Sequence, residues 1–273
     1  MTRFLSATLA VCATLALAPG AVTPSRADAE NAVHYYLSLG DSLAQGDQPT
    51  GDFSLGYADQ LYSALRATNS KLELIKLGCG GETTASMIDP ALPYEGRGAH
   101  FFCNYPHGSQ LAEAVNFLHA HKSSVSLVTI DIGADDLLHG GGAPTIRANL
   151  PVILAALHAA AGPSVPIIGM TYYDPFLAAI WFTTFDLAAL QAEANVNTIN
   201  GALEDVYGAF ADPVARVDTA FSNTDTTIQP GGLPLDVQRI CEWTWFCTAG
   251  DLHPNAAGYG VIANAFLTVI PPA

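Results

Sequence analysis

The chain has 273 residues, and its 25 acidic side chains outnumber the 10 basic ones to give a formal net charge of −15. A surface of this charge argues against nucleic acid and anionic membranes as partners, because both attract patches of Lys and Arg. The length allows one large domain or two small ones. No linker, repeat or low-complexity tract divides the sequence, so we expect one domain, over residues 28–273.

The N-terminus has the pattern of a secretory signal peptide. Arg3 precedes an apolar run over residues 4–18, and small residues follow, with candidate cleavage sites after Ala18 and Ala27. The run is shorter than the roughly 20 residues that a membrane-spanning helix needs. Cys12 lies inside the apolar run, so we expect no lipoprotein anchor there. These features predict a signal peptide over residues 1–27 and a secreted protein without stable membrane insertion.

Strand-like and helix-like runs alternate along the rest of the chain. This alternation predicts an α/β fold with a mostly parallel sheet covered on both faces. Because crossover connections are right-handed, the carboxyl ends of the first three strands should share one edge. Pro151 is expected to kink or divide its helix. The expected strands are residues 33–39, 72–77, 125–130, 165–172 and 215–217, and the expected helices are 57–67, a short one from Thr83 or Thr84, 111–119, 143–161, 187–210 and 255–270.

Four cysteines remain after the signal peptide, and an even number in an exported chain predicts two disulfides with three possible connectivities. We expect the neighbour pairs Cys79–Cys103 and Cys241–Cys247, because each closes a loop without crossing the fold. The spacings of the cysteines fit no usual zinc pattern. The histidines also show no grouping with carboxylates that is typical of a metal site: His34, His100, His107, His119, His121, His139 and His158. We therefore expect no metal site.

A serine follows the first strand, at a sheet edge where open α/β folds build their sites. Gly40-Asp41-Ser42-Leu43 is also a sequence that ordinary turns prefer. A serine becomes a nucleophile only when a neighbouring base takes its proton. His253, at the start of the last helix, can serve as that base. The motif lacks the second glycine of the Gly-x-Ser-x-Gly nucleophile elbow and follows the wrong strand for it, which disfavours an ordinary α/β-hydrolase.

Four blocks in this order resemble the GDSL, or SGNH, hydrolase family: residues 40–43, Gly78 within 77–83, residues 133–136, and residues 251–254. The resemblance implies a flavodoxin-like three-layer sandwich around a five-stranded parallel sheet, and hydrolysis of carboxylic esters without a cofactor. It also implies roles for individual residues. Ser42 is the expected nucleophile, His253 the base, and the backbone N–H groups of Ser42 and Gly78 the oxyanion donors.

Asp135 departs from the family pattern, which has an asparagine there. An amide donates to the oxyanion, whereas an ionised carboxylate only accepts hydrogen bonds and repels it. Three alternatives are open: Asp135 is protonated, it turns away from the site, or two backbone donors suffice. We expect a weak esterase favoured at acidic pH.

A second departure concerns the acid of the triad. Gly250 stands three residues before His253, where the family has its acid, and Asp251 is only two before. Either Asp251 orients His253 through a different turn, or the carbonyl of Gly250 does so and leaves a serine–histidine dyad. We favour Asp251.

Other acidic residues have structural interpretations. Asp41, Asp131 and Asp136 are expected to anchor turns through hydrogen bonds. Glu82 lies in a glycine-rich stretch, where exposure to solvent is expected.

Two apolar stretches bear on the substrate. Residues 175–182 follow the fourth strand without a helical stripe, which indicates either a loop folded into the core, an acyl-binding wall or a lipid-facing patch. Trp243, Trp245 and Phe246 are expected to form the opposite wall, held by the Cys241–Cys247 disulfide. This pattern favours acyl esters over sugar acetates.

The sequence therefore predicts a secreted, monomeric serine esterase or lipase that acts on small-molecule or lipid esters through an acyl-enzyme. A carbohydrate deacetylase using the same site is the first alternative. The second is an exported binding protein whose oxyanion hole Asp135 has weakened.

Overall fold

Five parallel strands form the central sheet of the computed structural model, which describes residues 33–92, 103–182 and 187–271. The expected signal peptide, and residues 93–102 of the glycine- and proline-rich stretch, lie outside the described residues. The strands are β1 (His34–Gly40), β2 (Leu72–Lys76), β3 (Val125–Asp131), β4 (Ile167–Met170) and β5 (Val214–Ala215), in the spatial order β2-β1-β3-β4-β5.

The central strands are buried along most of their length, as expected for a parallel sheet covered on both faces. Leu37 of β1 pairs with Ile75 of β2 on one side and with Val128 of β3 on the other. The chain therefore adds β2 on one side of β1 and the later strands on the other side, so the order of the strands reverses between β1 and β3. Ligands of open α/β sheets bind outside the carboxyl ends of the strands at such a switch point.

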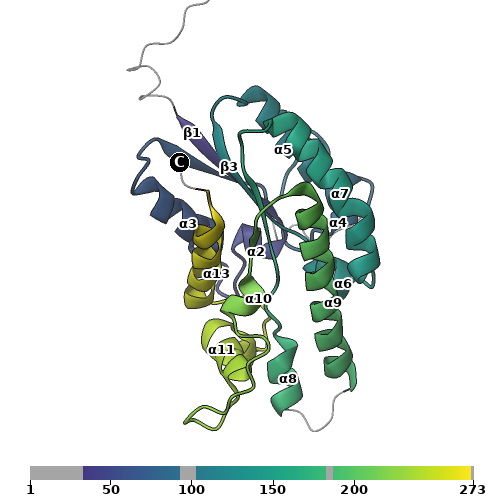
Figure 1. Cartoon of the computed structure of the whole chain (residues 1–273), viewed down its shortest axis with the longest axis vertical. Helices are drawn as coiled ribbons and strands as arrows, with labels where there is room; N and C mark the ends of the chain where they lie inside the picture. Colours follow the sequence, from purple (N-terminus) through teal and green to yellow (C-terminus); the bar gives the residue numbers. More distant parts are fainter. Residues whose placement is uncertain (1–32, 93–102, 183–186, 272–273) are drawn as a thin grey trace, which may run out of the picture. The chain divides into compact units, whose positions relative to one another are not determined.

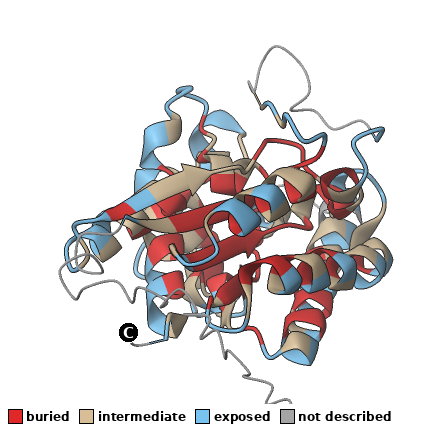
Figure 2. Cartoon of the chain, turned by 90° about the horizontal axis from the view of Figure 1, so that it is seen from above, coloured by how far each residue is buried: buried red, intermediate tan, exposed pale blue. Residues whose placement is uncertain are grey.

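Helices cover both faces of the sheet (Figure 1), and the buried residues concentrate between the layers (Figure 2). Helices α3 and α13 lie together on one face, and α5, α7 and α9 lie on the other. This arrangement confirms the predicted three-layer α/β fold. The helices are α2 (Ser42–Gln45), α3 (Tyr57–Arg66), α4 (Thr84–Ile88), α5 (Gln110–Ala120), α6 (Ala134–Leu138), α7 (Gly142–Ala161), α8 (Phe176–Phe182), α9 (Leu187–Phe210), α10 (Val217–Ala220), α11 (Leu235–Trp243), α12 (Phe246–Ala249) and α13 (Ala256–Val269), with a 3-10 turn, η1, at Phe53–Leu55.

Two segments differ from the expectation. Helix α7 is continuous through Pro151, because its neighbours Leu150, Ile153 and Leu154 are fully buried and fix the helix against the core. Residues 176–182 form a helix rather than an irregular loop, and the carboxylate of Asp174 accepts a hydrogen bond from the N–H of Phe176 at its start. Only Ala178 of this helix is buried, which explains why its sequence lacks a clear apolar stripe.

The two disulfides are Cys79–Cys103 and Cys241–Cys247, which confirms the neighbour pairing. Over the described ranges, no helix is long and apolar enough to cross a membrane. No group of three or more His, Cys, Asp or Glu side chains in these ranges is arranged to hold a metal ion.

Candidate active site

The turn after β1 places Ser42 at the first position of α2. Asp41 caps this short helix, because its side chain accepts a hydrogen bond from the N–H of Leu43 at 2.9 Å. Gly40 has a φ of +134°, and a Cβ there would lie 1.8 Å from the carbonyl oxygen of Asp131. Only glycine fits this position. The sharp turn brings Ser42 to the carboxyl edge of the sheet at the switch point.

Ser42, His253 and Asp251 form a continuous chain of hydrogen bonds. The Nε2 atom of His253 lies 2.9 Å from the Oγ atom of Ser42, and its Nδ1 atom lies 2.8 Å from a carboxylate oxygen of Asp251. A carboxylate only accepts, so the ring proton sits on Nδ1 and leaves Nε2 to accept the proton of the serine hydroxyl. The three side chains therefore have the geometry of a nucleophile, a base and an orienting acid.

Asp251 reaches the imidazole from only two residues away because of a local turn. The same carboxylate oxygen also accepts the backbone N–H of His253 at 2.8 Å. This double contact bends the chain between the two residues and aims the carboxylate at the ring. Of the two sequence alternatives, the geometry favours Asp251 over the carbonyl of Gly250.

His253 is surrounded by carboxylates that favour its charged form. Burial lowers the pKa of His253, but the hydrogen bond with Asp251 and the charges of Asp47, Asp251 and Asp41 outweigh that effect and raise it above 6.5. The pKa of Asp251 is lowered, chiefly by the same hydrogen bond. An imidazolium formed during catalysis would therefore be stabilised.

Asp47 is a site residue that the sequence analysis missed. Its Oδ2 atom lies 3.9 Å from Nε2 of His253, and burial raises its pKa. No motif signals it, since its position depends on the end of α2 at Gly46, which takes the left-handed conformation.

A pair of buried carboxyl groups lies beneath the nucleophile. Asp41 accepts a hydrogen bond from the hydroxyl of Tyr172, Asp131 accepts one from the hydroxyl of Tyr57, and the two carboxyls bond each other. Burial raises both pKa values, and the charge of Asp41 raises that of Asp131 further. We infer that Asp131 is the protonated partner. Both residues anchor the turn, as expected of them.

Asp136 likewise anchors a turn. Its two carboxylate oxygens accept hydrogen bonds from the N–H and the hydroxyl of Thr84, at 2.8 and 2.6 Å. It joins the first turn of α6 to the first turn of α4. Asp135, beside it, is buried and lines the same cavity as Ser42.

The structure places Gly78 away from the cavity that Ser42 and His253 line. A Cβ at Gly78 would lie 2.3 Å from the Cβ of Ala44, so this glycine allows the segment after β2 to pass close to α2. The cavity wall is instead made by Gly80 and Gly81. The N–H of Gly80 donates to the side chain of Gln45 at 2.9 Å.

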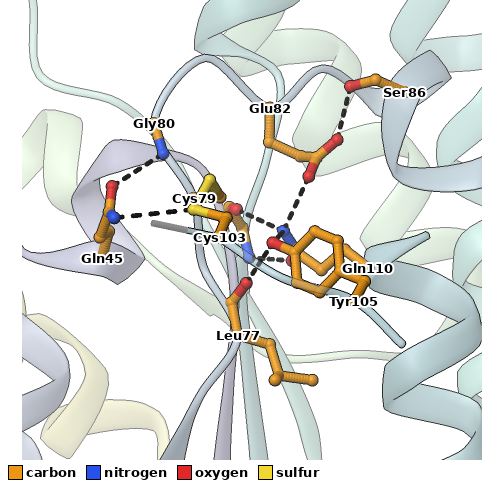
Figure 3. Close-up of a disulfide and its surroundings, with 10 residues drawn as sticks. Gln45, Leu77, Cys79, Gly80, Glu82, Ser86, Cys103, Tyr105 and Gln110 are labelled. Atoms are coloured by element: carbon orange, nitrogen blue, oxygen red, sulfur yellow. Dashed lines mark hydrogen bonds between the residues drawn. A yellow bond between two sulfur atoms is a disulfide. The ribbon is translucent and has the colours of Figure 1, made fainter. Parts of the chain in front are cut away.

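Glu82 is fully buried, which corrects the expectation that it is exposed to solvent. Figure 3 shows its carboxylate between the hydroxyl of Ser86 and the amide of Gln110, next to the Cys79–Cys103 disulfide. The burial follows from this pairing, because a buried carboxylate needs donors.

Gln110 fixes the turn that carries the nucleophile. Its side chain accepts the N–H of Gly40 at 2.7 Å and donates to the carbonyl of the same residue at 2.9 Å. It also donates to the hydroxyl of Tyr105, which in turn donates to the carbonyl of Leu77 (Figure 3). Sequence reasoning missed Gln110 because nothing in the helical pattern of α5 distinguishes it from an exposed glutamine.

The cavity in front of Ser42 has a volume of about 180 Å³ and a largely apolar wall. This wall comes from α6, α8, α9 and the segment before α8, through Leu137, Leu138, Tyr173, Phe176, Val196 and Ile199. Phe176 lines the cavity, as expected for the acyl-binding wall. Trp181 and Phe182, from the same apolar stretch, are not among the lining residues and are 46% and 60% exposed.

The prediction that aromatic residues near His253 form the opposite wall of the cavity is wrong. Trp243, Trp245 and Phe246 do not line this cavity in the described part of the chain. Trp243 instead packs edge-on against Phe221 and lies under the guanidinium of Arg239. Their closeness to His253 in sequence therefore does not place them in the wall of the cavity.

The chain matches the family model described as GDSL-like lipase/acylhydrolase over residues 38–261, and it belongs to that family. No curated protein matches it in sequence. Its fold is similar to that of the acetyl xylan esterase AlAXEase, with 13% identity, a TM-score of 0.57, and coverage of 87% of this chain and all of the other.

Two further solved structures are similar. A carbohydrate acetylesterase family member from Sinorhizobium meliloti is 16% identical with a TM-score of 0.52, covering 86% of this chain and 95% of its own. A lipolytic G-D-S-L family protein from Veillonella parvula is 15% identical with a TM-score of 0.50, covering 87% and 98%. At these identities the likeness shows a shared fold and nothing more.

Proposed function

We propose that the protein is a secreted serine esterase or lipase that hydrolyses acyl esters through a covalent acyl-enzyme. The observation that carries the proposal is the hydrogen-bonded chain from Ser42 through His253 to Asp251. Membership of a lipase/acylhydrolase family supports the same reaction class. The mature protein would comprise residues 28–273.

The mechanism follows from the hydrogen bonds of His253, whose Nδ1 donates to Asp251 and whose Nε2 accepts from Ser42. As the Oγ atom of Ser42 attacks the ester carbonyl, Nε2 of His253 takes its proton, and Asp251 stabilises the imidazolium. The imidazolium then gives the proton to the leaving alcohol oxygen as the carbon–oxygen bond breaks. Water attacks the acylated Ser42 in the second half, with His253 accepting the water proton and returning it to the serine oxygen.

We assign the oxyanion donors to the backbone N–H groups of Ser42 and Gly81. Gly81 lines the cavity, and the N–H of its neighbour Gly80 is engaged by Gln45, so Gly81 replaces Gly78 in this role. Each such donor can contribute roughly 3–4 kcal/mol to the transition state. Asp135 lines the same cavity, and an ionised carboxylate there would repel the oxyanion.

The apolar wall supports acyl esters over sugar acetates as substrates. Apolar side chains gain roughly 25 cal/mol for each Å² that an acyl chain covers, whereas sugar hydroxyls need polar partners. A series of p-nitrophenyl esters from acetate to decanoate tests this preference. A rise in kcat/KM beyond acetate supports it, and turnover of acetylated xylan with little activity on longer chains supports the deacetylase instead.

A fluorophosphonate probe tests the reaction class directly. The probe should label the wild-type protein at Ser42, and Ser42→Ala should abolish labelling. A folded wild-type protein that is not labelled would favour the exported binding protein. N-terminal sequencing of the protein recovered from culture medium tests secretion and cleavage after residue 27.

A further inference from the structure

Asp47 is held rigidly beside the catalytic histidine. Its backbone N–H donates to the carbonyl of Ser42 at 2.9 Å, and its carbonyl accepts the hydroxyl of Tyr259 at 2.6 Å. The side chain is 16% exposed and lines the cavity together with Ser42 and His253. These bonds hold the backbone of Asp47, and its carboxylate also accepts a backbone hydrogen bond from Gln48.

The carboxylate of Asp47 lies near the nitrogen that protonates the leaving alcohol. Nε2 of His253 must pass its proton to the alcohol oxygen, which requires an approach of about 3 Å. Oδ2 of Asp47 lies 3.9 Å from the same nitrogen. The alcohol oxygen is therefore at most about 7 Å from the carboxylate of Asp47 during its departure.

No basic side chain offsets this charge at the cavity. Among the described residues that line it, the charged side chains are Asp41, Asp47 and Asp135, and Lys and Arg are absent. Asp41 is bonded to Tyr172 and Asp131 below the cavity, and we assign Asp135 to the oxyanion side of the site. Asp47 lies 3.9 Å from the nitrogen that protonates the alcohol. The charge that the alcohol part meets most directly is thus that of Asp47.

We propose that Asp47 determines which alcohol part of an ester the site accepts, favouring a positive charge near the ester oxygen and disfavouring a negative one. The inference rests on the proposed ester hydrolysis and deepens it. It names the substrate class as acyl esters of neutral or cationic alcohols, and it argues against esters of alcohols that carry a phosphate or sulfonate close to the scissile bond.

Three butyryl esters of nearly equal size test the proposal. Choline carries a trimethylammonium group, 3,3-dimethylbutanol is its neutral isostere, and 2-hydroxyethanesulfonate carries an anionic group at the same distance. At low salt, kcat/KM should fall by about five- to tenfold at each step from cation to neutral to anion. The charged group lies roughly 4 Å beyond the alcohol oxygen, and unit charges roughly 7–11 Å apart interact at about this strength in a partly hydrated site. Raising the salt concentration should compress these ratios in the wild-type protein.

Asp47→Asn should bring all three kcat/KM values within about twofold of each other, because the amide keeps the shape and removes the charge. The ratios within each protein are compared, so a general loss of activity does not affect the test. Glu73→Gln is the matched control, because Glu73 is an exposed residue of β2 outside the cavity and its loss changes the net charge equally. Its ratios should equal those of the wild type.

Equal ratios in the wild-type protein and Asp47→Asn would overturn the assignment of Asp47, as would wild-type ratios that do not respond to salt. If none of the three esters is hydrolysed and the fluorophosphonate probe does not label Ser42, the proposed function itself fails, and the assignment falls with it. Labelling without discrimination among the three esters refutes only the role of Asp47.

Discussion

Asp174→Asn should make the protein more stable at neutral pH while leaving the cap of α8 in place. One carboxylate oxygen of Asp174 accepts the N–H of Phe176 at 2.9 Å, and the other is buried without a hydrogen-bond partner among the described residues. Burial raises the pKa of this carboxyl from 3.8 to about 7, and the nearby charges of Glu193 and Asp236 add to the effect. The ionised form is thus poorly accommodated in the folded state.

The sign of the pH effect follows from proton binding. Between pH 4 and 7 the folded protein keeps this proton while the unfolded chain loses it, so the free energy of unfolding falls as pH rises. A rise of about three pKa units, from 3.8 to about 7, corresponds to about 4 kcal/mol at about 1.4 kcal/mol per unit. This contribution is fully present below pH 4 and lost above pH 7.

Urea unfolding of the wild type and Asp174→Asn across pH 4 to 8 provides the measurement. The amide does not titrate, so the difference in unfolding free energy between variant and wild type should shift by about 4 kcal/mol toward the variant as pH rises. Any constant cost of burying the amide cancels in this comparison. Ala178→Gly, in the same helix but without a titrating group, should give a difference that is independent of pH. A flat difference for Asp174→Asn would refute the reasoning.

Three further predictions concern catalysis. Asp251→Ala should lower kcat by roughly 10⁴-fold, and near-wild-type kcat would instead favour orientation of His253 by the Gly250 carbonyl. Asp135→Asn should raise kcat by about tenfold or more by adding a donor to the oxyanion hole and should move the pH optimum upward; an unchanged pH–rate profile contradicts this. Because the pKa of His253 is raised and only the neutral imidazole acts as base, kcat/KM should increase with pH to above 6.5, and Asp47→Asn should shift this acidic limb to lower pH.

The raised pKa of His253 opposes the acidic optimum expected from Asp135 alone. The acidic optimum was expected from the charge in the oxyanion hole alone, whereas Asp47, Asp251 and Asp41 together raise the pKa of the base. The pH–rate profiles of the wild type and Asp135→Asn separate the two effects. The acidic limb set by the histidine is common to both profiles, whereas an effect of the charge at residue 135 would appear as a difference between them.

The fold and the hydrogen bonds among Ser42, His253 and Asp251 could be predicted because they depend on the order of motifs and of strands and helices along the sequence. Ser42 and His253 stand in recognisable blocks, and alternating strands and helices define the sheet edge that brings them together. The disulfides followed from proximity in sequence. Each of these inferences needed only local pattern and the handedness of crossover connections.

What the sequence did not predict depends on how side chains pack in three dimensions. Glu82 was expected to be exposed, but Gln110 from a distant helix supplies a donor that permits its burial. Asp47 reaches the histidine through the turn that ends α2. The aromatic residues near His253 were assigned to the cavity because they are neighbours in sequence, yet α6 and α9 supply much of that wall. Local patterns carry no information on such long-range partners.

The proton shared by Asp41 and Asp131 makes the stability of the scaffold depend on pH separately from the chemistry of the site. Burial and the charge of Asp41 raise the pKa of Asp131, so the folded state loses stability as pH rises through that value. Beyond it, two like charges would face each other under the serine. Stabilisation of this one buried pair would therefore widen the pH range over which the scaffold holds Ser42 in place, without altering the reacting groups.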